Sequence, residues 1–447
     1  TNSGMAQFKA YFAGESTPPH PRLTTSQKSF RTTDIDEVGD ATHLTLFEML
    51  GNFSFGDYFK KEACEWSLDL MVNHLGFDRD RIYITIYDDD DEAEQVWIDL
   101  GVEPERIYRF GDEDNWWGPA GAEGPCGPCS ELHYYRGSMD DVPALDDPIR
   151  QNGWGPNTHD DFLEVYNLVF TQFYRDIDGN DTPLPNKNID TGMGLERAAA
   201  VLQEVSTLYD TDVFQPVISK VEQIAGRKWG DEPGIDRAIG AIAEHARSAS
   251  FLIGDGVVPG NTGRGYVLRR IIRRAMRFGL TLGMESPFIG SIAEVAMDQM
   301  AGVYPELKDN RPFILRVLDI EEQSFARAIA QGTRVLDGMF EYRDSHASVT
   351  ETLDTAIATG KTSDDLTEFL NENGFDSPEG DDSASVGSRA AYEAIKDLIG
   401  AAVGSDGDEL ARQRALNWTT MVSGPEAFLL YDTYGFPPEL VREDALD

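Results

Sequence analysis

A ten-residue stretch at 188–197, Asn-Ile-Asp-Thr-Gly-Met-Gly-Leu-Glu-Arg, constrains the fold more than any other part of the chain. Its two glycines, Gly192 and Gly194, predict a break in structure where the backbone turns tightly or approaches a ligand closely. The residues after this break, 195–205, have the apolar spacing of a helix, with Leu195, Ala199 and Leu202 on one face. The stretch therefore predicts a glycine-rich junction that leads into a helix.

Charged residues flank the glycines of this junction. Arg197 falls in the first turn of the predicted helix, beside backbone N–H groups without partners, which makes it a candidate seat for a phosphate. Asp190, on the other side of the glycines, could receive an ammonium group. The alternative is an ordinary loop-to-helix junction with a surface arginine, because short glycine motifs recur by chance.

Residues 23–58 predict two extended segments around a polar loop at 32–41. Arg31 ends the first segment, and His43 and Phe47, four residues apart, share one face of the second. An aromatic ring beside a histidine and an arginine could hold a purine and its phosphates. A hairpin with an aromatic residue in its core is the alternative.

Further strands and helices between residues 59 and 173 predict an α/β scaffold. A helix is expected at 59–76, with Ala63, Trp66, Leu70 and Met71 on its apolar face, then a strand at 81–87 and a helix at 92–100. Trp116 and Trp117 lie in a loop and could form a pocket wall or pack in the core. Strands are expected at 130–135 and 162–173, and Asn167 in the latter needs a backbone or ligand partner if buried.

The three cysteines are too few for a disulfide framework or a structural zinc site. Cys126 and Cys129 form a Cys-Gly-Pro-Cys segment that is expected to be a rigid turn before a strand. Buried thiols are one interpretation of this pair, and a redox pair is the alternative. No stretch approaches the roughly 20 apolar residues of a membrane span, and no signal segment opens the chain, so a cytoplasmic protein without a membrane partner is expected.

The net charge of −41, from 79 acidic against 38 basic residues, argues against nucleic-acid binding by the surface as a whole. The distribution of the charges is more informative, because residues 256–284 contain no acid. This segment carries Arg264, Arg269, Arg270, Arg273, Arg274 and Arg277. An acidic surface with one basic strip suggests a protein adapted to high salt that keeps a single site for an anionic partner.

Helical periodicity dominates after residue 208, with helices expected at 235–253, 266–279, 291–300 and 312–343. In the second of these, an apolar face lies opposite the arginines from Arg269 to Arg277, which favours contact with phosphates over a merely solvated face. Residues 344–422 predict an acidic insertion, partly mobile and with short helices, before order returns at 428.

Five segments in order, 47–59, 124–129, 190–197, 265–274 and 430–436, resemble the alanyl-tRNA synthetase family of class II aminoacyl-tRNA synthetases. The resemblance implies an α+β fold, with an antiparallel-sheet catalytic domain at 1–207. It also implies a mainly helical tRNA-recognition domain at 208–447, interrupted by the acidic insertion at about 344–422.

The family resemblance further implies ATP-dependent formation of alanyl-adenylate, with Mg²⁺, and transfer of alanine to tRNA(Ala). The catalytic residues would be Arg31 on the α-phosphate, Arg197 on the γ-phosphate and Asp190 on the substrate ammonium. The other implied ATP ligands are Phe47, which would stack on adenine, and His43. The alanine pocket would contain Trp117, Asn167, Asp190 and Gly192, and the acceptor stem would meet Asn261, Arg269, Arg270, Arg273, Arg274 and Asp432, with Asn261 and Asp432 reading its G·U pair.

Departures from the family pattern bear on these expectations. The motif 2 loop at 32–39 is shorter than the bacterial form and lacks its glycine pair and lysine. Most of motif 1 and the zinc-bearing editing domain are expected to lie outside this sequence, so the chain resembles a fragment truncated at both ends, and no metal ligand is assigned in it. A non-catalytic tRNA-binding paralogue or an inactive fragment of the same fold is the alternative function.

Overall fold

The computed structural model describes residues 1–33, 35–119, 121–144, 147–151, 153–346, 355, 366–372, 375–404 and 422–434. The chain divides into two compact units, Thr1–Asp319 and Ile320–Asp447. The sequence placed its domain boundary at 207/208, where strands give way to helices. The first unit extends beyond that point and contains both the sheet and the first helices that follow it. None of the described helices is long and apolar enough to cross a membrane.

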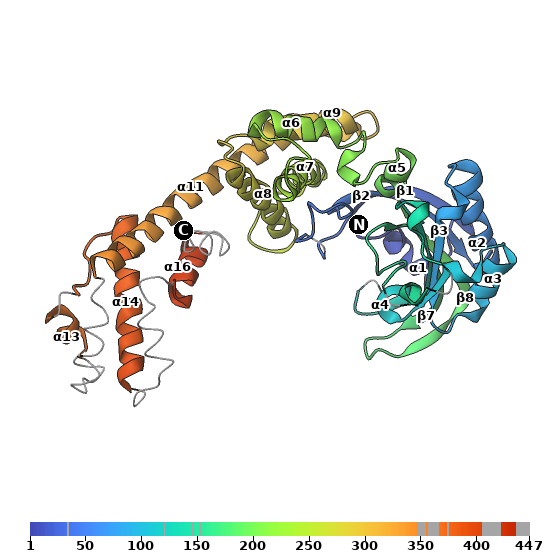
Figure 1. The fold of residues 1–447 in the computed structure, drawn as a ribbon, viewed down its shortest axis with the longest axis horizontal. Helices are drawn as coiled ribbons and strands as arrows, with labels where there is room; N and C mark the ends of the chain where they lie inside the picture. The colour runs from blue at the N-terminus through green and yellow to red at the C-terminus, as the bar shows by residue number, and fades with distance from the viewer. Residues whose placement is uncertain are drawn as a thin grey trace. The chain divides into compact units, whose positions relative to one another are not determined.

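An eight-stranded sheet forms the centre of the first unit (Figure 1). Its strands are β1 (Arg22–Phe30), β2 (Leu46–Phe55), β3 (Ile82–Tyr87), β4 (Ile107–Phe110), β5 (Trp116–Trp117), β6 (Gly124–Tyr135), β7 (Phe162–Arg175) and β8 (Asp181–Gly194). They lie in the order β1-β2-β8-β7-β6-β3-β4, with β5 paired to β6. All pairs are antiparallel except β3–β4, which is parallel. The predicted α+β class is confirmed.

The main core of the first unit lies between the sheet and two helices, α2 (Lys60–Asp69) and α3 (Asp91–Asp99). Alternate apolar residues of the strands face these helices, as the period of two requires. Trp97 of α3 is fully buried there, and its indole nitrogen donates to Ser130 Oγ of β6 at 2.9 Å. This packing leaves the opposite side of β2, β7 and β8 available for a site.

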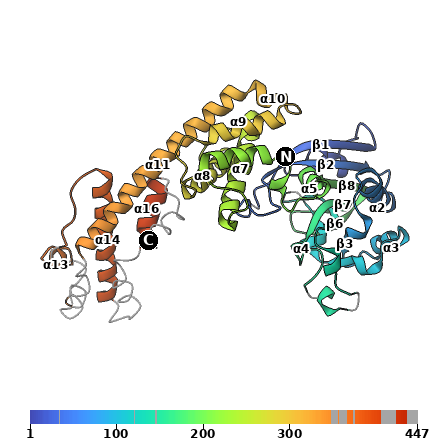
Figure 2. The same ribbon diagram turned by 45° about the horizontal axis from the view of Figure 1, so that its top comes forward.

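Helices fill the rest of the first unit (Figure 2). They are α1 (Lys9–Phe12), α4 (Asp112–Asn115), α5 (Leu195–Leu202), α6 (Gln215–Ala225), α7 (Pro233–Gly254), α8 (Gly263–Thr281), α9 (Ile289–Met300) and α10 (Pro305–Asp309). The predicted helices at 235–253, 266–279 and 291–300 are confirmed as α7, α8 and α9. Helix α7 is buried nearly all round, since α6, α8 and α9 pack against it and Glu244 and Arg247 of its middle turns contact the start of β2.

Helix α11 (Arg311–Ser345) contains the residue at which the second unit begins, and it confirms the prediction at 312–343. The second unit also contains α13 (Leu366–Glu372), α14 (Ser383–Gly404) and α16 (Gly424–Tyr434). Its core includes Tyr392 and Ile395 of α14, and Arg343 donates to both carboxylate oxygens of Glu426 at 2.6 and 2.7 Å. The 22-residue α14 is longer than the short helices expected of the acidic insertion, whose other predicted parts lie mostly outside the described residues.

The junction at 188–197 differs from its prediction in two ways. Gly192 and Gly194 lie within β8, and neither has a positive φ, so the predicted turn is wrong. The helix begins at Leu195 as expected, but it buries Ala198, Ala200 and Val201 rather than the predicted face, and Leu202 is 47% exposed. Strand β8 ends at Gly194 and the helix begins at Leu195, with no loop between them. The direction of the strand therefore determines which side of the helix faces the core.

Two other local predictions need correction. The helix expected at 59–76 is α2 followed by one π-helical turn, Leu70–His74, and Trp66 is 42% exposed rather than part of the buried face. The Cys-Gly-Pro-Cys segment lies inside strand β6, where a register shift between Cys126 and Cys129 takes the place of the expected turn. Both thiols are buried and unpaired, and burial raises the pKa of Cys126 to about 11, which supports the buried-thiol interpretation.

Candidate active site

A cavity of about 290 Å³ is lined by residues of β2, β6, β7 and β8 and by the loops next to them. All of the residues that the sequence assigned to ATP or alanine lie on its wall. They are Arg31, His43, Phe47, Trp117, Asn167, Asp190, Gly192 and Arg197. The antiparallel order of β1, β2, β8 and β7 explains how residues so far apart in the sequence come together.

Asp190 lies in the last third of β8, paired with Val169 of β7, and is only 5% exposed. Burial raises the pKa of its carboxyl group to about 8, although the positive charge of Arg31 acts in the opposite direction. At neutral pH the carboxyl group is therefore mostly protonated in the free protein. A ligand ammonium group could displace that proton and provide the charge that ionisation of a buried carboxyl requires.

Asn167 and Gly192 face each other across the β7–β8 pair. The Asn167 amide nitrogen donates to Glu131 Oε1 at 2.7 Å, whereas its Oδ1 is buried without a hydrogen-bond partner among the described residues. A buried amide oxygen of this kind suits a ligand N–H. A Cβ on Gly192 would come within 3.3 Å of Met49 Sδ, so this wall of the cavity is close-packed.

Trp117 belongs to the short strand β5, where it pairs with Gly127 of β6. Its ring also packs against the cluster formed by Met5, Phe12 and Phe53. Trp117 was expected either to pack in the core or to form a pocket wall. It does both, because it packs against this cluster and also lines the cavity.

Arg31 and Phe47 lie in contact with each other on the cavity wall. Phe47 pairs with Ser29 of β1, and the guanidinium of Arg31 lies 5.3 Å from the centre of the Phe47 ring. Arg31 Nε also donates to the carbonyl oxygen of Asn2 at 3.0 Å. His43 precedes β2, rather than lying on it as predicted, and its Nδ1 is 2.6 Å from Asp40 Oδ2. An aromatic ring and a guanidinium in contact can hold a flat base and a phosphate.

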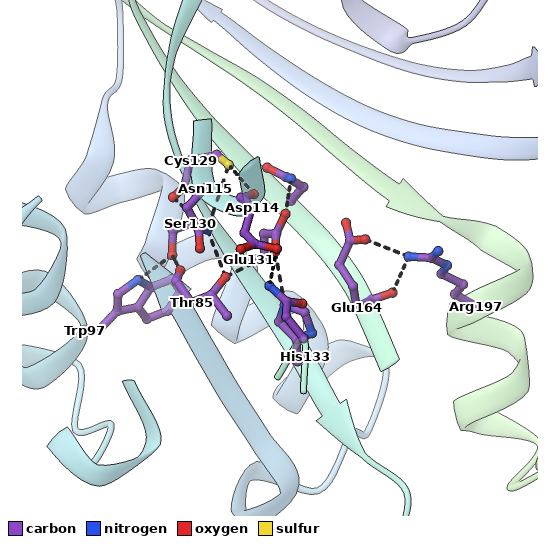
Figure 3. A network of polar contacts seen from close by, with 12 residues as sticks. Thr85, Trp97, Asp114, Asn115, Cys129, Ser130, Glu131, His133, Glu164 and Arg197 are labelled. Atoms are coloured by element: carbon purple, nitrogen blue, oxygen red, sulfur yellow. Dashed lines mark hydrogen bonds and ion pairs between the residues drawn. The ribbon is translucent and has the colours of Figure 1, made fainter. Parts of the chain in front are cut away.

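A polar network on β6 and β7, which sequence reasoning missed, contributes Glu131 and Glu164 to the cavity wall (Figure 3). Glu131 Oε2 accepts from Thr85 Oγ1 at 3.2 Å and is 3.1 Å from His133 Nε2. Burial and the charge of Glu164 raise the pKa of Glu131. The signal was present in the sequence, because Glu131 and His133 alternate on one face of an otherwise apolar strand.

Arg197, in the first turn of α5, points into the same cavity. Its Nη1 donates to the carbonyl oxygen of Glu164 at 3.0 Å and to Glu164 Oε2 at 2.7 Å (Figure 3). Desolvation opposes ionisation of Glu164, but Arg197 and His133 together lower the pKa of that carboxyl group. The guanidinium is thus held by a carboxylate at the place where a phosphate was expected.

The arginines of α8 occupy different environments. Arg270 pairs with Asp36 at 3.0 Å, and Arg269 donates to Asn261 Oδ1. Arg273 is partly exposed. The prediction that Arg274 lies on the exposed polar face is wrong, because it is only 9% exposed and donates to the carbonyl oxygen of Val38 at 3.0 Å. Helical spacing alone could not show that the loop before β2 lies over this part of α8.

The two residues assigned to the G·U pair lie in different units. Asn261 is exposed in the loop before α8, and Asp432 lies in helix α16, where its side chain is outside the described part of the chain. Among the described residues, no group of three or more His, Cys, Asp and Glu side chains is arranged to hold a metal ion.

Comparison with known proteins identifies the family of this chain. The family model described as tRNA synthetases class II (A) matches residues 1–359. An alanine–tRNA ligase of Dehalococcoides mccartyi (strain BAV1) is 47% identical over 338 residues, which cover 75% of this chain and 38% of that protein. An alanine–tRNA ligase of Natranaerobius thermophilus is 41% identical over 443 residues, or 99% of this chain and 42% of that protein.

The chain thus spans about two fifths of the length of these curated relatives. Among solved structures, the apo histidyl-tRNA synthetase of S. aureus covers 47% of this chain and 53% of its own, with 13% identity and a TM-score of 0.27, an overlap too small to support an argument. The family match includes the whole sheet, the cavity and helices α5 to α10. The chain belongs to the class II tRNA synthetase family.

Proposed function

We propose that this protein activates alanine with ATP, forming alanyl-adenylate and pyrophosphate, and transfers the alanyl group to tRNA(Ala). The observation that carries the proposal is the buried carboxyl group of Asp190 in the same cavity as Arg31, Phe47 and Arg197. A carboxyl group of this kind selects a cationic group, and the same cavity offers an aromatic ring and a guanidinium. An amino acid and a nucleotide together satisfy both features.

In the proposed reaction, a carboxylate oxygen of alanine attacks the α-phosphorus of ATP, and the bond from that phosphorus to the pyrophosphate oxygen breaks. Asp190 and Asn167 Oδ1 hold the ammonium group and so orient the carboxylate. Arg31 stabilises the charge that develops on the α-phosphate oxygens, and Phe47 stacks on the adenine. His43, which lines the same cavity, would lie beside the phosphates.

Arg197 requires a change of partner in this scheme. In the free protein Arg197 is bound to Glu164. Arg197 and Glu164 both line the cavity, so in the complex the guanidinium can turn from Glu164 to the γ-phosphate. Glu131 and Glu164 offer carboxylate oxygens there, a donor set that suits Mg²⁺ completed by phosphate oxygens and water. Bound Mg²⁺ would supply charge neutralisation for the leaving pyrophosphate.

For the second step, we propose that the acceptor stem of tRNA(Ala) lies on the exposed side of α8. Arg269, Arg270 and Arg273 would contact phosphates, and Arg274 would support the helix from its buried position. Asn261 and Asp432 would read the G·U pair. The free, unpaired thiols are typical of a reducing compartment, so we place the reaction in the cytoplasm.

Alanine-dependent exchange of labelled pyrophosphate into ATP tests the proposal. The wild-type chain is expected to catalyse the exchange, and Arg31→Ala is expected to reduce it by about 10²-fold or more, because one donor to the transition state is lost. Arg109→Ala is the matched control, since that arginine pairs with Asp91 and Glu94 away from the cavity. Binding of tRNA without any exchange would favour the alternative, a non-catalytic tRNA-binding protein of the same fold.

A further inference from the structure

The first residues of β2 pair with β1 on one edge and are held by buried carboxylates on the other edge, where β8 would lie. Pairing with β8 begins only at Met49. Before that point, the backbone nitrogens of Thr45 and Leu46 donate to Glu244 Oε1 at 2.7 and 3.1 Å, and the backbone nitrogen of Glu48 donates to Glu196 Oε2 at 3.0 Å. On the edge away from β1, the segment 45–48, which includes Phe47, therefore depends on side chains of α7 and α5 for its position.

Glu244 receives further hydrogen bonds in a place closed to water. Thr45 Oγ1 and Ser248 Oγ donate to its Oε1 at 2.6 and 2.8 Å. Its other oxygen lies 2.5 Å from Nδ1 of His245. Glu244 and His245 are fully buried and Thr45 is 1% exposed, so these contacts have no competition from solvent.

Arg274 of α8 extends this series of hydrogen bonds and determines which ring nitrogen of His245 carries the proton. Arg274 Nη1 lies 2.8 Å from His245 Nε2, and a guanidinium can only donate, so Nε2 accepts. The imidazole proton is then on Nδ1, where it is donated to Glu244. Burial and the positive charge of Arg274 lower the pKa of His245, which keeps the ring neutral. Although burial opposes ionisation of Glu244, the neighbouring His245 and the hydrogen bonds from Thr45 and Ser248 lower the pKa of this carboxyl group.

Arg274 also contacts the loop between β1 and β2. Its Nη2 donates to the carbonyl oxygens of Asp36 and Val38 at 3.1 and 3.0 Å. Arg274 therefore contacts both the loop before β2 and the buried hydrogen-bonded residues, His245 and Glu244, that lead to the first residues of β2.

We infer that the chain Arg274–His245–Glu244 positions residues 45–48 from helix α8, and so ties the cavity wall at Phe47 to the helix that faces RNA. These are positioning residues, because none of them lies on the cavity wall. The inference rests on the proposed function, in which Phe47 receives adenine. Asp190 and Asn167 are held by β7 and β8 instead, so alanine binding does not depend on this chain.

The test compares the affinities for ATP and for alanine in two variants that weaken the hydrogen bonds of Arg274, His245 and Glu244. His245→Leu keeps the size of the side chain but removes both hydrogen bonds, and it is expected to weaken ATP binding at least tenfold while alanine binding changes less than twofold. Thr45→Val removes a single hydroxyl without changing shape, and a threefold to fivefold loss for ATP alone is expected. His245→Asn restores the donor to Glu244, so ATP affinity should recover in part.

Asp90→Asn is the matched control, because Asp90 is another buried carboxylate that pairs with a buried cation, Lys60, but it lies outside the cavity. It should lower thermal stability as His245→Leu does and leave ATP affinity unchanged. The inference would be overturned if His245→Leu and Thr45→Val lost affinity for ATP and for alanine equally. It would also be overturned if their loss of ATP affinity were no larger than that of Asp90→Asn. Failure of the wild-type chain to bind ATP would instead refute the proposed function.

A second readout uses an acceptor-stem RNA duplex. In the wild-type chain the duplex is expected to change ATP affinity at least threefold, and in His245→Leu this effect should fall to within 1.5-fold, because coupling between two ligands requires a physical connection. An unchanged effect in His245→Leu would contradict the assigned link.

Discussion

The affinity for alanine is expected to depend on pH because Asp190 is buried as an acid. In the free protein its pKa is about 8, since burial penalises the charged form more than Arg31 stabilises it. Alanine carries its ammonium group throughout the range from pH 6 to 8. Only the ionised carboxyl group can pair with that ammonium, so binding requires the loss of the Asp190 proton.

The size of the effect follows from the pKa of about 8. The ionised fraction is about one tenth at pH 7 and about one hundredth at pH 6, and the apparent dissociation constant is the intrinsic one divided by this fraction. Affinity should therefore rise about tenfold per pH unit, or about 1.4 kcal/mol, and level off above pH 8. At pH 7 each alanine bound should release close to one proton.

Isothermal titration in two buffers of different ionisation enthalpy measures both the affinity and the proton release. Asp190→Asn provides the control: it should lose the pH dependence, and it should bind alanine more weakly than the wild type above pH 8 by about 1.5–3 kcal/mol, with ATP affinity retained. A wild-type affinity for alanine that stays constant from pH 6 to 8, with no proton released, would refute the reasoning about Asp190.

Four further outcomes are expected. The pKa of Asp190 in the folded protein lies above its unfolded value of 3.8, so this group favours folding fully below pH 3.8 and loses that effect as the pH rises through about 8. Asp190→Asn should therefore raise the free energy of unfolding at pH 8 by a few kcal/mol, as measured by urea titration. Asn167→Ala should weaken alanine by about 1–2 kcal/mol and leave ATP binding alone, as measured by titration of each ligand. Glycine should be activated only about fivefold to tenfold less efficiently than alanine in the exchange assay, because one methyl group contributes about 1–1.4 kcal/mol. Arg273→Glu should weaken binding of every tRNA in a filter assay and lower its salt dependence, whereas Asn261→Ala should only remove the preference for a G·U-bearing stem.

The sequence predicted the elements of the sheet and the main helices because their apolar periodicity is strong and local. The strands around Phe47 and Asn167 and the helices α7, α8 and α9 all appear within a few residues of their expected bounds. The grouping of the candidate site residues was implied by family motifs rather than by periodicity, since a period of two or 3.6 does not show which strands are neighbours.

The failures share a physical cause, which is that long-range contacts decide the environment of a side chain. Arg274 follows the spacing of an exposed arginine, yet the loop at 36–38 and His245 bury it. Trp66 has the spacing of a core residue but is 42% exposed, and its ring lies against Tyr58 and the guanidinium of Arg22 in β1. The Glu131 network was missed because polar residues in a strand suggest an exposed face until the neighbouring strands are known.

The most direct test of the central claim is a single-turnover reaction of the chain with ATP, Mg²⁺ and alanine. The products to be measured are pyrophosphate and the adenylate that remains bound to the protein. The proposed chemistry predicts a rapid burst of about one pyrophosphate per active chain, with an equal amount of alanyl-adenylate and no ADP. Formation of ADP and phosphate, or a complete absence of adenylate while both ligands bind, would contradict it.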